Sequence, residues 1–182
     1  MGNGADASLE QRIRSLVRDV PGFPKAGVVF KDITPLLADA NAFRDATAAM
    51  AEPFAQGRVD LVAAIESRGF ILGGPVAQRL GAGFVPVRKP GKLPSRTQGI
   101  DYALEYGSDR LEVHVDAIGE IQRERVLVVD DVLATGGTAA ATCTLLESMG
   151  ATVVGVSFLL ALSFLPGLER LASRSPRALI TF

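Results

Sequence analysis

The residues best suited to chemistry lie in Val126–Thr138, which reads VLVVDDVLATGGT. Its apolar start is typical of a central parallel strand that is covered on both faces. The strand is expected to end at Asp130, so the carboxylates of Asp130 and Asp131 would stand at its carboxyl end. Open α/β sheets bind ligands at that edge. The segment therefore predicts a ligand site that contains two acidic groups.

A phosphate-binding loop is predicted directly after these carboxylates, at Ala134–Thr138. Gly136 and Gly137 allow the backbone to turn tightly and approach a ligand closely, while Thr135 and Thr138 offer hydroxyl donors. A helix is expected to follow, and its free N–H groups and dipole favour a phosphate dianion. Two glycines alone would indicate an ordinary strand-to-helix turn, but the whole segment favours a phosphate site.

The two carboxylates narrow the choice of ligand. Carboxylates repel phosphate but accept hydrogen bonds from ribose hydroxyls, and a magnesium ion can also use such a negative region. No lysine follows the glycines, as a nucleoside-triphosphate P-loop requires, and the segment lacks the G-x-G-x-x-G of a dinucleotide site. A ribose 5-phosphate group fits the pattern best.

The surrounding segments predict an α/β fold with a mostly parallel central sheet flanked by helices, because strands and helices alternate. Strands are expected at 61–65, 83–87, 126–129 and 151–160, and helices at 73–80 and 137–149. Between them, Arg88–Gly99 is polar and rich in proline and glycine. A mobile loop explains this stretch better than a core element, and long loops in compact domains are often functional.

Composition limits the class of protein. The 182 residues fit a single domain over 1–182, with 48% apolar and 21% charged residues. The formal net charge of −1 shows no basic excess, so no nucleic-acid partner is expected. No signal peptide is recognised, and the most apolar stretch, Ala151–Leu165, is too short for a membrane span. Because Cys143 is the one cysteine, a reducing, cytoplasmic location is expected.

Several segments carry a resemblance to a known family. Val126–Thr138 closely resembles the phosphoribosyl-pyrophosphate (PRPP) motif of the type I phosphoribosyltransferases. Four further segments resemble the adenine phosphoribosyltransferases of that family, namely PGFPKAGVVFKDITPLL, ESRGF, VRKPGKLP and YALEYG, at residues 21–37, 66–70, 87–94 and 102–107. The resemblance implies a small N-terminal hood with the base-recognition segment (about 1–37), a core (38–182), a flexible active-site loop and a homodimer.

The resemblance also implies which residues hold the sugar. Asp130 and Asp131 would bind the ribose 2- and 3-hydroxyls, and Ala134–Thr138 would wrap the 5-phosphate. A magnesium ion is the implied cofactor, held mainly through pyrophosphate and water, and no direct protein ligand is assigned to it.

Pyrophosphate binding is implied for two segments. Ser67 and Arg68 lie in a turn that often carries a non-proline cis peptide in this family, and a guanidinium can grip a diphosphate with two hydrogen bonds. Arg88 and Lys89 would form a flap that excludes water and can reach the partner subunit's site. From residue types alone, a surface arginine and a solvated charge run are the alternatives.

The resemblance gives Glu105 the acid–base role, because a carboxylate beside the imidazole edge of adenine can accept the N9 proton. Extended backbone at Val29, Phe30 and Lys31 would meet the Watson–Crick edge, and Phe30 and Val132 would sandwich the ring. Lys31 stands where family members carry arginine and lacks its planar fork. An exposed edge-strand glutamate and a plain core phenylalanine are the alternatives for Glu105 and Phe30.

The predicted reaction is purine salvage by a glycosyltransferase: adenine and PRPP give AMP and pyrophosphate through an oxocarbenium-like transition state. Two alternatives stay open. The base could be hypoxanthine, guanine or xanthine, although the lysine and acidic residue that read a 6-oxo group are not recognised here. The chain could instead be a PRPP sensor without catalysis, although about twenty residues before Pro21 are too few for a DNA-binding module.

Overall fold

The computed structural model describes residues 3–104, 107–119 and 124–182. They divide into two compact units, Met1–Ala49 and Met50–Phe182, and each is described by itself. The division of the chain into a hood over 1–37 and a core over 38–182 stays a prediction.

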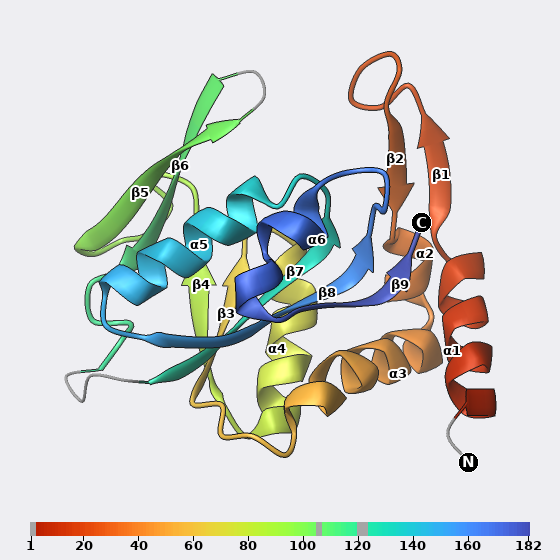
Figure 1. The fold of residues 1–182 in the computed structure, drawn as a ribbon, viewed down its shortest axis with the longest axis horizontal. Coiled ribbons are helices and arrows are strands. Elements are labelled where there is room, and N and C mark those ends of the chain that lie inside the picture. Colours follow the sequence, from red (N-terminus) through yellow and green to blue (C-terminus); the bar gives the residue numbers. More distant parts are fainter. Residues whose placement is uncertain (1–2, 105–106, 120–123) are drawn as a thin grey trace. The chain divides into compact units, whose positions relative to one another are not determined.

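A five-stranded sheet forms the centre of the second unit, and all of its strand pairs are parallel (Figure 1). Its order is β4-β3-β7-β8-β9. The strands are β4 (Gly83–Val87), β3 (Leu61–Ile65), β7 (Arg125–Leu133), β8 (Thr152–Ala161) and β9 (Pro176–Thr181). This arrangement confirms the predicted α/β class with a mostly parallel sheet.

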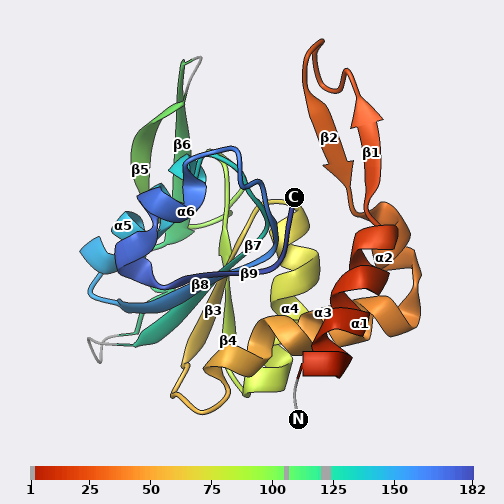
Figure 2. The same cartoon turned by 45° about the vertical axis from the view of Figure 1, so that its right-hand side comes forward.

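Helices cover both faces of this sheet, with α4 (Arg68–Leu80) on one face and α5 (Gly137–Ser148) on the other (Figure 2). As expected for a strand buried on both sides, Val126, Leu127, Val128 and Val129 of β7 are all fully buried. Two short elements, α6 (Gly167–Arg170) and η2 (Ala172–Arg174), connect β8 to β9, and η1 (Glu52–Phe54) precedes β3.

Three predicted boundaries next to the ligand site were wrong. Helix α4 begins at Arg68 rather than at residue 73, because Gly69 and Gly73 fit closely against the sheet instead of interrupting the helix. Strand β7 does not end at Asp130 but continues to Leu133, which pairs with Ala161 of β8. The predicted loop Arg88–Gly99 ends early, because Thr97 already begins a strand. Its mobility stays a prediction.

An antiparallel hairpin stands beside the sheet in the second unit. It consists of β5 (Thr97–Leu104) and β6 (Gly107–His114). A bridge between Arg88 and Glu112, with N···O distances of 2.7 and 2.9 Å, joins the end of β4 to this hairpin. The basic residues that follow β4 are therefore tied to β6 through the backbone.

The first unit contains α1 (Asn3–Ser15), β1 (Arg18–Pro21), β2 (Val29–Asp32), α2 (Thr34–Ala38) and most of α3 (Ala40–Ala51). Strands β1 and β2 pair antiparallel, and the turn between them contains a cis bond before Pro24. Across the parts of the chain that the structure describes, no helix is both long and apolar enough to cross a membrane.

Candidate active site

The loop between β7 and α5 is shaped for close contact with a ligand. Gly136 takes a left-handed conformation with φ 75°, which favours glycine, and serves as the N-cap of α5. A hollow of about 90 Å³ lies against Ala134–Thr138, compared with roughly 30 Å³ for one water in the liquid. The first N–H groups of α5 have no partner within the helix, so this end of the helix attracts an anion.

Asp130 and Asp131 lie within β7, two residues before the strand ends and this loop begins. The N–H of Asp131 donates to Oδ1 of Asp130 at 2.9 Å. Burial, followed by repulsion from Asp131, raises the pKa of the Asp130 carboxyl well above its usual value. Two adjacent carboxylates near the carboxyl end of the central strand are therefore held close together at an electrostatic cost.

Arg68 balances part of this negative charge. Its Nε lies 2.8 Å from Oδ2 of Asp131, a residue that is only 5% exposed. This contact is an ion pair without hydrogen-bond geometry, because Oδ2 has no hydrogen-bond partner within the described part of the chain. Arg68 therefore places a guanidinium directly beside the acidic pair.

The start of α4 approaches β7 so closely that a side chain larger than that of glycine would be crowded there. A Cβ atom on Gly69 would lie 3.0 Å from Oδ1 of Asp130 and 3.1 Å from the carbonyl oxygen of Val129. This approach brings Arg68 to the acidic pair. The peptide bond between Glu66 and Ser67 is cis, as the resemblance implied.

Glu66 organises the basic residues after β4. Its Oε2 accepts hydrogen bonds from Nε of Arg88 at 3.1 Å and from the backbone N–H of Lys89 at 3.0 Å. Burial raises the pKa of Glu66, but these hydrogen bonds outweigh it and leave that pKa below its usual value. The Arg88 guanidinium also lies over the ring of Phe70, 5.7 Å from its centre. Arg88 is therefore held in place rather than solvated freely.

The β5–β6 hairpin contributes two residues that the sequence analysis did not single out. The hydroxyl of Tyr102 lies 3.3 Å from Oγ1 of Thr138 and donates to Oδ2 of Asp109 at 3.3 Å. Asp109 also pairs with Nζ of Lys89 at 3.2 Å. The YALEYG segment pointed to this region, but nothing in the alternation of residues identified the partners of Tyr102.

A cleft of about 500 Å³ brings most of the predicted ligand residues of the second unit together. The predicted residues that line it are Ser67, Arg68, Lys89, Asp130, Asp131, Val132, Ala134 and Thr138. Thr135, Gly136 and Gly137 line the smaller hollow, which shares Asp130 and Ala134 with the cleft. Arg88 does not line the cleft itself. It donates a hydrogen bond to Glu66, which does line the cleft.

The residues predicted to bind the base fall in different parts of the chain. Val29, Phe30 and Lys31 belong to β2 in the first unit. There Val29 is 49% exposed, the Phe30 ring packs edge-on against Phe23 at 5.1 Å, and Nζ of Lys31 donates to Asp19 at 2.7 Å. Glu105 and its neighbour at position 106 lie outside the residues that the structure describes.

The side chains around the cleft indicate the kind of ligand that it suits. Arg68 and Lys89 supply basic groups, Asp130 and Asp131 supply carboxylates, and the adjoining loop offers N–H groups and hydroxyls. A molecule that carries both hydroxyls and anionic groups matches this set of side chains.

Comparisons with known proteins show which family the chain resembles. Residues 32–167 match the model of the phosphoribosyl transferase domain. The adenine phosphoribosyltransferase of Myxococcus xanthus is 54% identical over 177 residues, which cover 97% of this chain and 95% of the relative. The crystal structure of the adenine phosphoribosyltransferase from Thermoanaerobacter pseudethanolicus superposes with a TM-score of 0.88 at 49% identity, covering 94% of this chain and 99% of that one. The Saccharomyces cerevisiae enzyme, solved with adenine and an imino-altritol bisphosphate, gives 0.87 at 37% identity over 95% and 99% of the two chains.

Proposed function

This chain belongs to the adenine phosphoribosyltransferases within the phosphoribosyl transferase domain family, and on that premise we propose how its residues carry out the reaction. It is a purine-salvage enzyme that transfers the phosphoribosyl group of PRPP to adenine, giving AMP and pyrophosphate. The observation that carries the assignment of residues is the cleft where Arg68, the two aspartates and both ends of the phosphate loop meet.

PRPP binds with its 5-phosphate at Ala134–Thr138 in this proposal. The N–H groups at the start of α5 and the hydroxyls of Thr135 and Thr138 donate to the phosphate oxygens. Asp130 and Asp131 accept hydrogen bonds from the ribose 2- and 3-hydroxyls. Positive charge that develops on the ribose ring in the transition state is stabilised by these carboxylates.

Pyrophosphate leaves toward the basic end of the cleft. Arg68 donates to it from the start of α4, and the backbone of the cis peptide at Ser67 lies next to this position. Lys89 exchanges its contact with Asp109 for the diphosphate, and Arg88 stays anchored on Glu66 as the flap closes over the site. Closure excludes water, which would otherwise capture the oxocarbenium-like centre.

A magnesium ion fits the chemistry of this cleft. Magnesium prefers oxygen ligands and usually keeps several waters, and the cleft offers the carboxylates of Asp130 and Asp131. Within the described residues, no group of three or more acidic, histidine or cysteine side chains gathers as a protein cage. The two aspartates would therefore hold the ion through water and pyrophosphate. When bound, it neutralises charge on the pyrophosphate leaving group.

Adenine recognition is assigned to the extended backbone at Val29–Lys31. The ring of Phe30 and the side chain of Val132 would sandwich the base. The exposed position of Val29 on β2 supports this assignment, because its surface is available to a ligand. Glu105 accepts the N9 proton as that nitrogen attacks C1 of the ribose with inversion. The protein otherwise positions the reactants and stabilises charge.

The test of the function is an assay with adenine, PRPP and magnesium, in which AMP should form. Hypoxanthine, guanine and xanthine, offered in competition, should give little product. Tight PRPP binding without AMP would favour a sensor instead of an enzyme. Preferred turnover of a 6-oxo purine would contradict the assigned base.

The acid–base role of Glu105 has its own test. Glu105→Ala should lower kcat by about 10²–10⁴-fold, the usual contribution of a general base, while the affinity for PRPP stays near that of the unaltered enzyme. Near-normal turnover would remove this role and leave the enzyme assignment intact.

We also propose that the enzyme is a cytoplasmic homodimer. The dimer rests on the family resemblance of the basic residues after β4, which can reach a partner subunit's site in that family. The single cysteine, buried and free, agrees with a reducing compartment.

A further inference from the structure

Helix α6 packs directly on the phosphate loop, although it lies far along the chain from it. A Cβ atom on Gly167, the first residue of α6, would lie 2.3 Å from the carbonyl oxygen of Ala134. A Cβ atom on Gly136 would lie 3.1 Å from both Cα and the carbonyl oxygen of Gly167. Contacts this close leave no room for a side chain on either glycine, so α6 has a fixed position over the loop.

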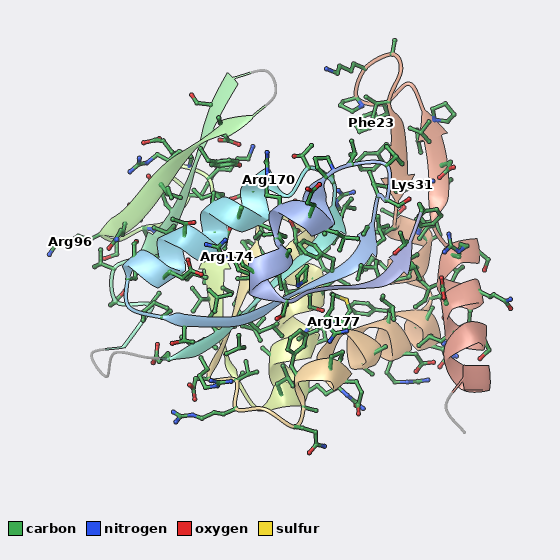
Figure 3. All side chains as sticks on the ribbon, in the orientation of Figure 1. Phe23, Lys31, Arg96, Arg170, Arg174 and Arg177 are labelled. Atoms are coloured by element: carbon green, nitrogen blue, oxygen red, sulfur yellow. The ribbon has the colours of Figure 1, made fainter. Side chains whose placement is uncertain are left out.

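The last residue of α6, Arg170, extends its side chain to the start of α5 (Figure 3). Its Nη1 lies 3.1 Å from the position that a Cβ atom on Gly137 would occupy. Oγ1 of Thr135 lies 3.9 Å from the same position. A guanidinium and a phosphate-loop hydroxyl therefore both lie within 4 Å of the Cβ position of Gly137.

This placement is electrostatically unfavourable as it stands. The N-terminal end of a helix carries partial positive charge and disfavours a cation. Within the described part of the chain, Arg170 makes no ion pair and no side-chain hydrogen bond. Arg174, one turn further on, shows the contrast, because it pairs with Glu147 through two hydrogen bonds of 3.0 and 2.8 Å. A cation beside a helix N-terminus is stabilised when an anion lies between them.

We propose that Arg170 binds the 5-phosphate of PRPP and AMP, an inference that rests on the proposed function. The loop itself supplies only N–H groups and hydroxyls, because no lysine or arginine occurs in Ala134–Thr138. Arg170 supplies the side-chain cation that a phosphate dianion needs. Its guanidinium donates to a phosphate oxygen from the α6 side, while α5 donates from the other side. The resemblance to the family did not assign a role to this residue.

The test compares Arg170→Gln, Arg170→Lys and a control, Arg177→Gln, which alters an exposed arginine on β9 away from the loop (Figure 3). Calorimetric titration gives the Kd of each variant for AMP and for pyrophosphate. R170Q should weaken AMP binding roughly tenfold, the loss typical of one charged hydrogen bond. R170K should recover part of that loss, since it keeps the charge. R177Q should bind AMP like the unaltered protein.

The Kd for pyrophosphate shows whether the loss of AMP binding comes from the missing contact of Arg170 with the 5-phosphate or from a general disturbance of the cleft. Its Kd should be unchanged in all three variants, because it binds at the end of the cleft near Arg68. AMP affinity of R170Q within twofold of the unaltered protein would overturn the inference, as would equal loss of AMP and pyrophosphate binding. If the unaltered protein makes AMP in the enzyme assay, such a result counts against Arg170 alone; absence of AMP formation would instead count against the proposed function.

Discussion

Asp130 and Asp131 stand next to each other at the end of β7, where two carboxylates repel one another. Arg68 relieves the charge of Asp131 through an ion pair, but burial raises the pKa of Asp130 well above its usual value. The surroundings of Asp130 in the folded protein therefore disfavour the charged form of its carboxyl. Such a conflict between stability and function is common at active sites.

Asp130→Asn should stabilise the protein at neutral pH while it weakens PRPP binding. A carboxyl whose folded pKa is raised stabilises the fold below its unfolded pKa and loses that contribution as pH rises through the folded pKa. At pH 7 the variant should melt about 2–4 °C higher, which corresponds to ~1 kcal/mol in a chain of this size. Below the unfolded pKa, near 4, the difference should vanish. Thermal unfolding followed from pH 4 to pH 8 measures this.

Asp109→Asn is the matched control, for which the melting temperature at pH 7 should change in the opposite direction. The backbone N–H of Arg110 lowers the pKa of Asp109, so its charge stabilises the fold above the unfolded pKa and that contribution is lost as pH falls. D109N should therefore melt below the unaltered protein at pH 7. If D130N also melts lower there, the conflict assigned to Asp130 does not exist.

At the residue scale, the sequence predicted the roles of residues that are neighbours along the chain. It missed the contacts between side chains that are far apart in the sequence. The aspartates and the glycines of the loop follow one another along the chain, so their joint role is visible in the sequence. Tyr102 reaches Thr138 from another strand, and Glu66 holds Arg88 and Lys89 from the end of β3. Such contacts depend on which strands become neighbours, and no local pattern of residues encodes them.

At the element scale, alternating apolar runs predicted the sheet well. The strands at Leu61–Ile65 and Gly83–Val87 have the predicted bounds, because each is a short apolar run with clear ends, although β4 is only partly buried. Prediction failed where glycines fit against neighbours. The helix was expected only from residue 73, but Gly73 lies within α4 where a Cβ atom would come within 2.5 Å of Ala64, so the helix packs tightly there. Close packing between elements, rather than local flexibility, explains these glycines.

Gly167→Ala should show how far α6 supports the phosphate loop. The added Cβ would meet the carbonyl oxygen of Ala134 at 2.3 Å, so α6 or the loop must shift. Overpacking of this kind costs about 1–3 kcal/mol, and the KM for PRPP should rise with the fall in melting temperature. Steady-state kinetics and thermal unfolding measure the two effects.

Gly74→Ala serves as the control for Gly167→Ala. Gly74 lies inside α4, and a Cβ atom there has no neighbour within 4 Å. Alanine favours a helix over glycine by up to about 1 kcal/mol, so G74A should be as stable as the unaltered protein or more so. A G167A variant that behaves like G74A would show that α6 does not support the loop.

At the scale of the whole molecule, the proposed binding residues are divided between the two units. Val29–Lys31, assigned to the base, lie in the first unit, and the phosphate loop lies in the second. The overall α/β class could be predicted because it follows from the order of strands and helices. A homodimer stays a proposal, because no residue pattern within one chain describes the surface that two copies would share.

Sedimentation should find the protein as a dimer at the concentrations used for kinetics. The expected mass is twice the 19.1 kDa of one chain. A protein that sediments as one chain and still makes AMP at the full rate would contradict the proposed homodimer and the reach of the flap into a partner's site.

A crystal structure with AMP bound tests the central claim most directly, because one ligand reports on the phosphate, the ribose and the base together. The 5-phosphate should accept hydrogen bonds from the backbone N–H groups of Thr135–Thr138, and both ribose hydroxyls should donate to Asp130 and Asp131. Adenine should meet the backbone at Val29–Lys31. A phosphate bound away from Ala134–Thr138, with the ribose hydroxyls far from the two aspartates, would contradict the account.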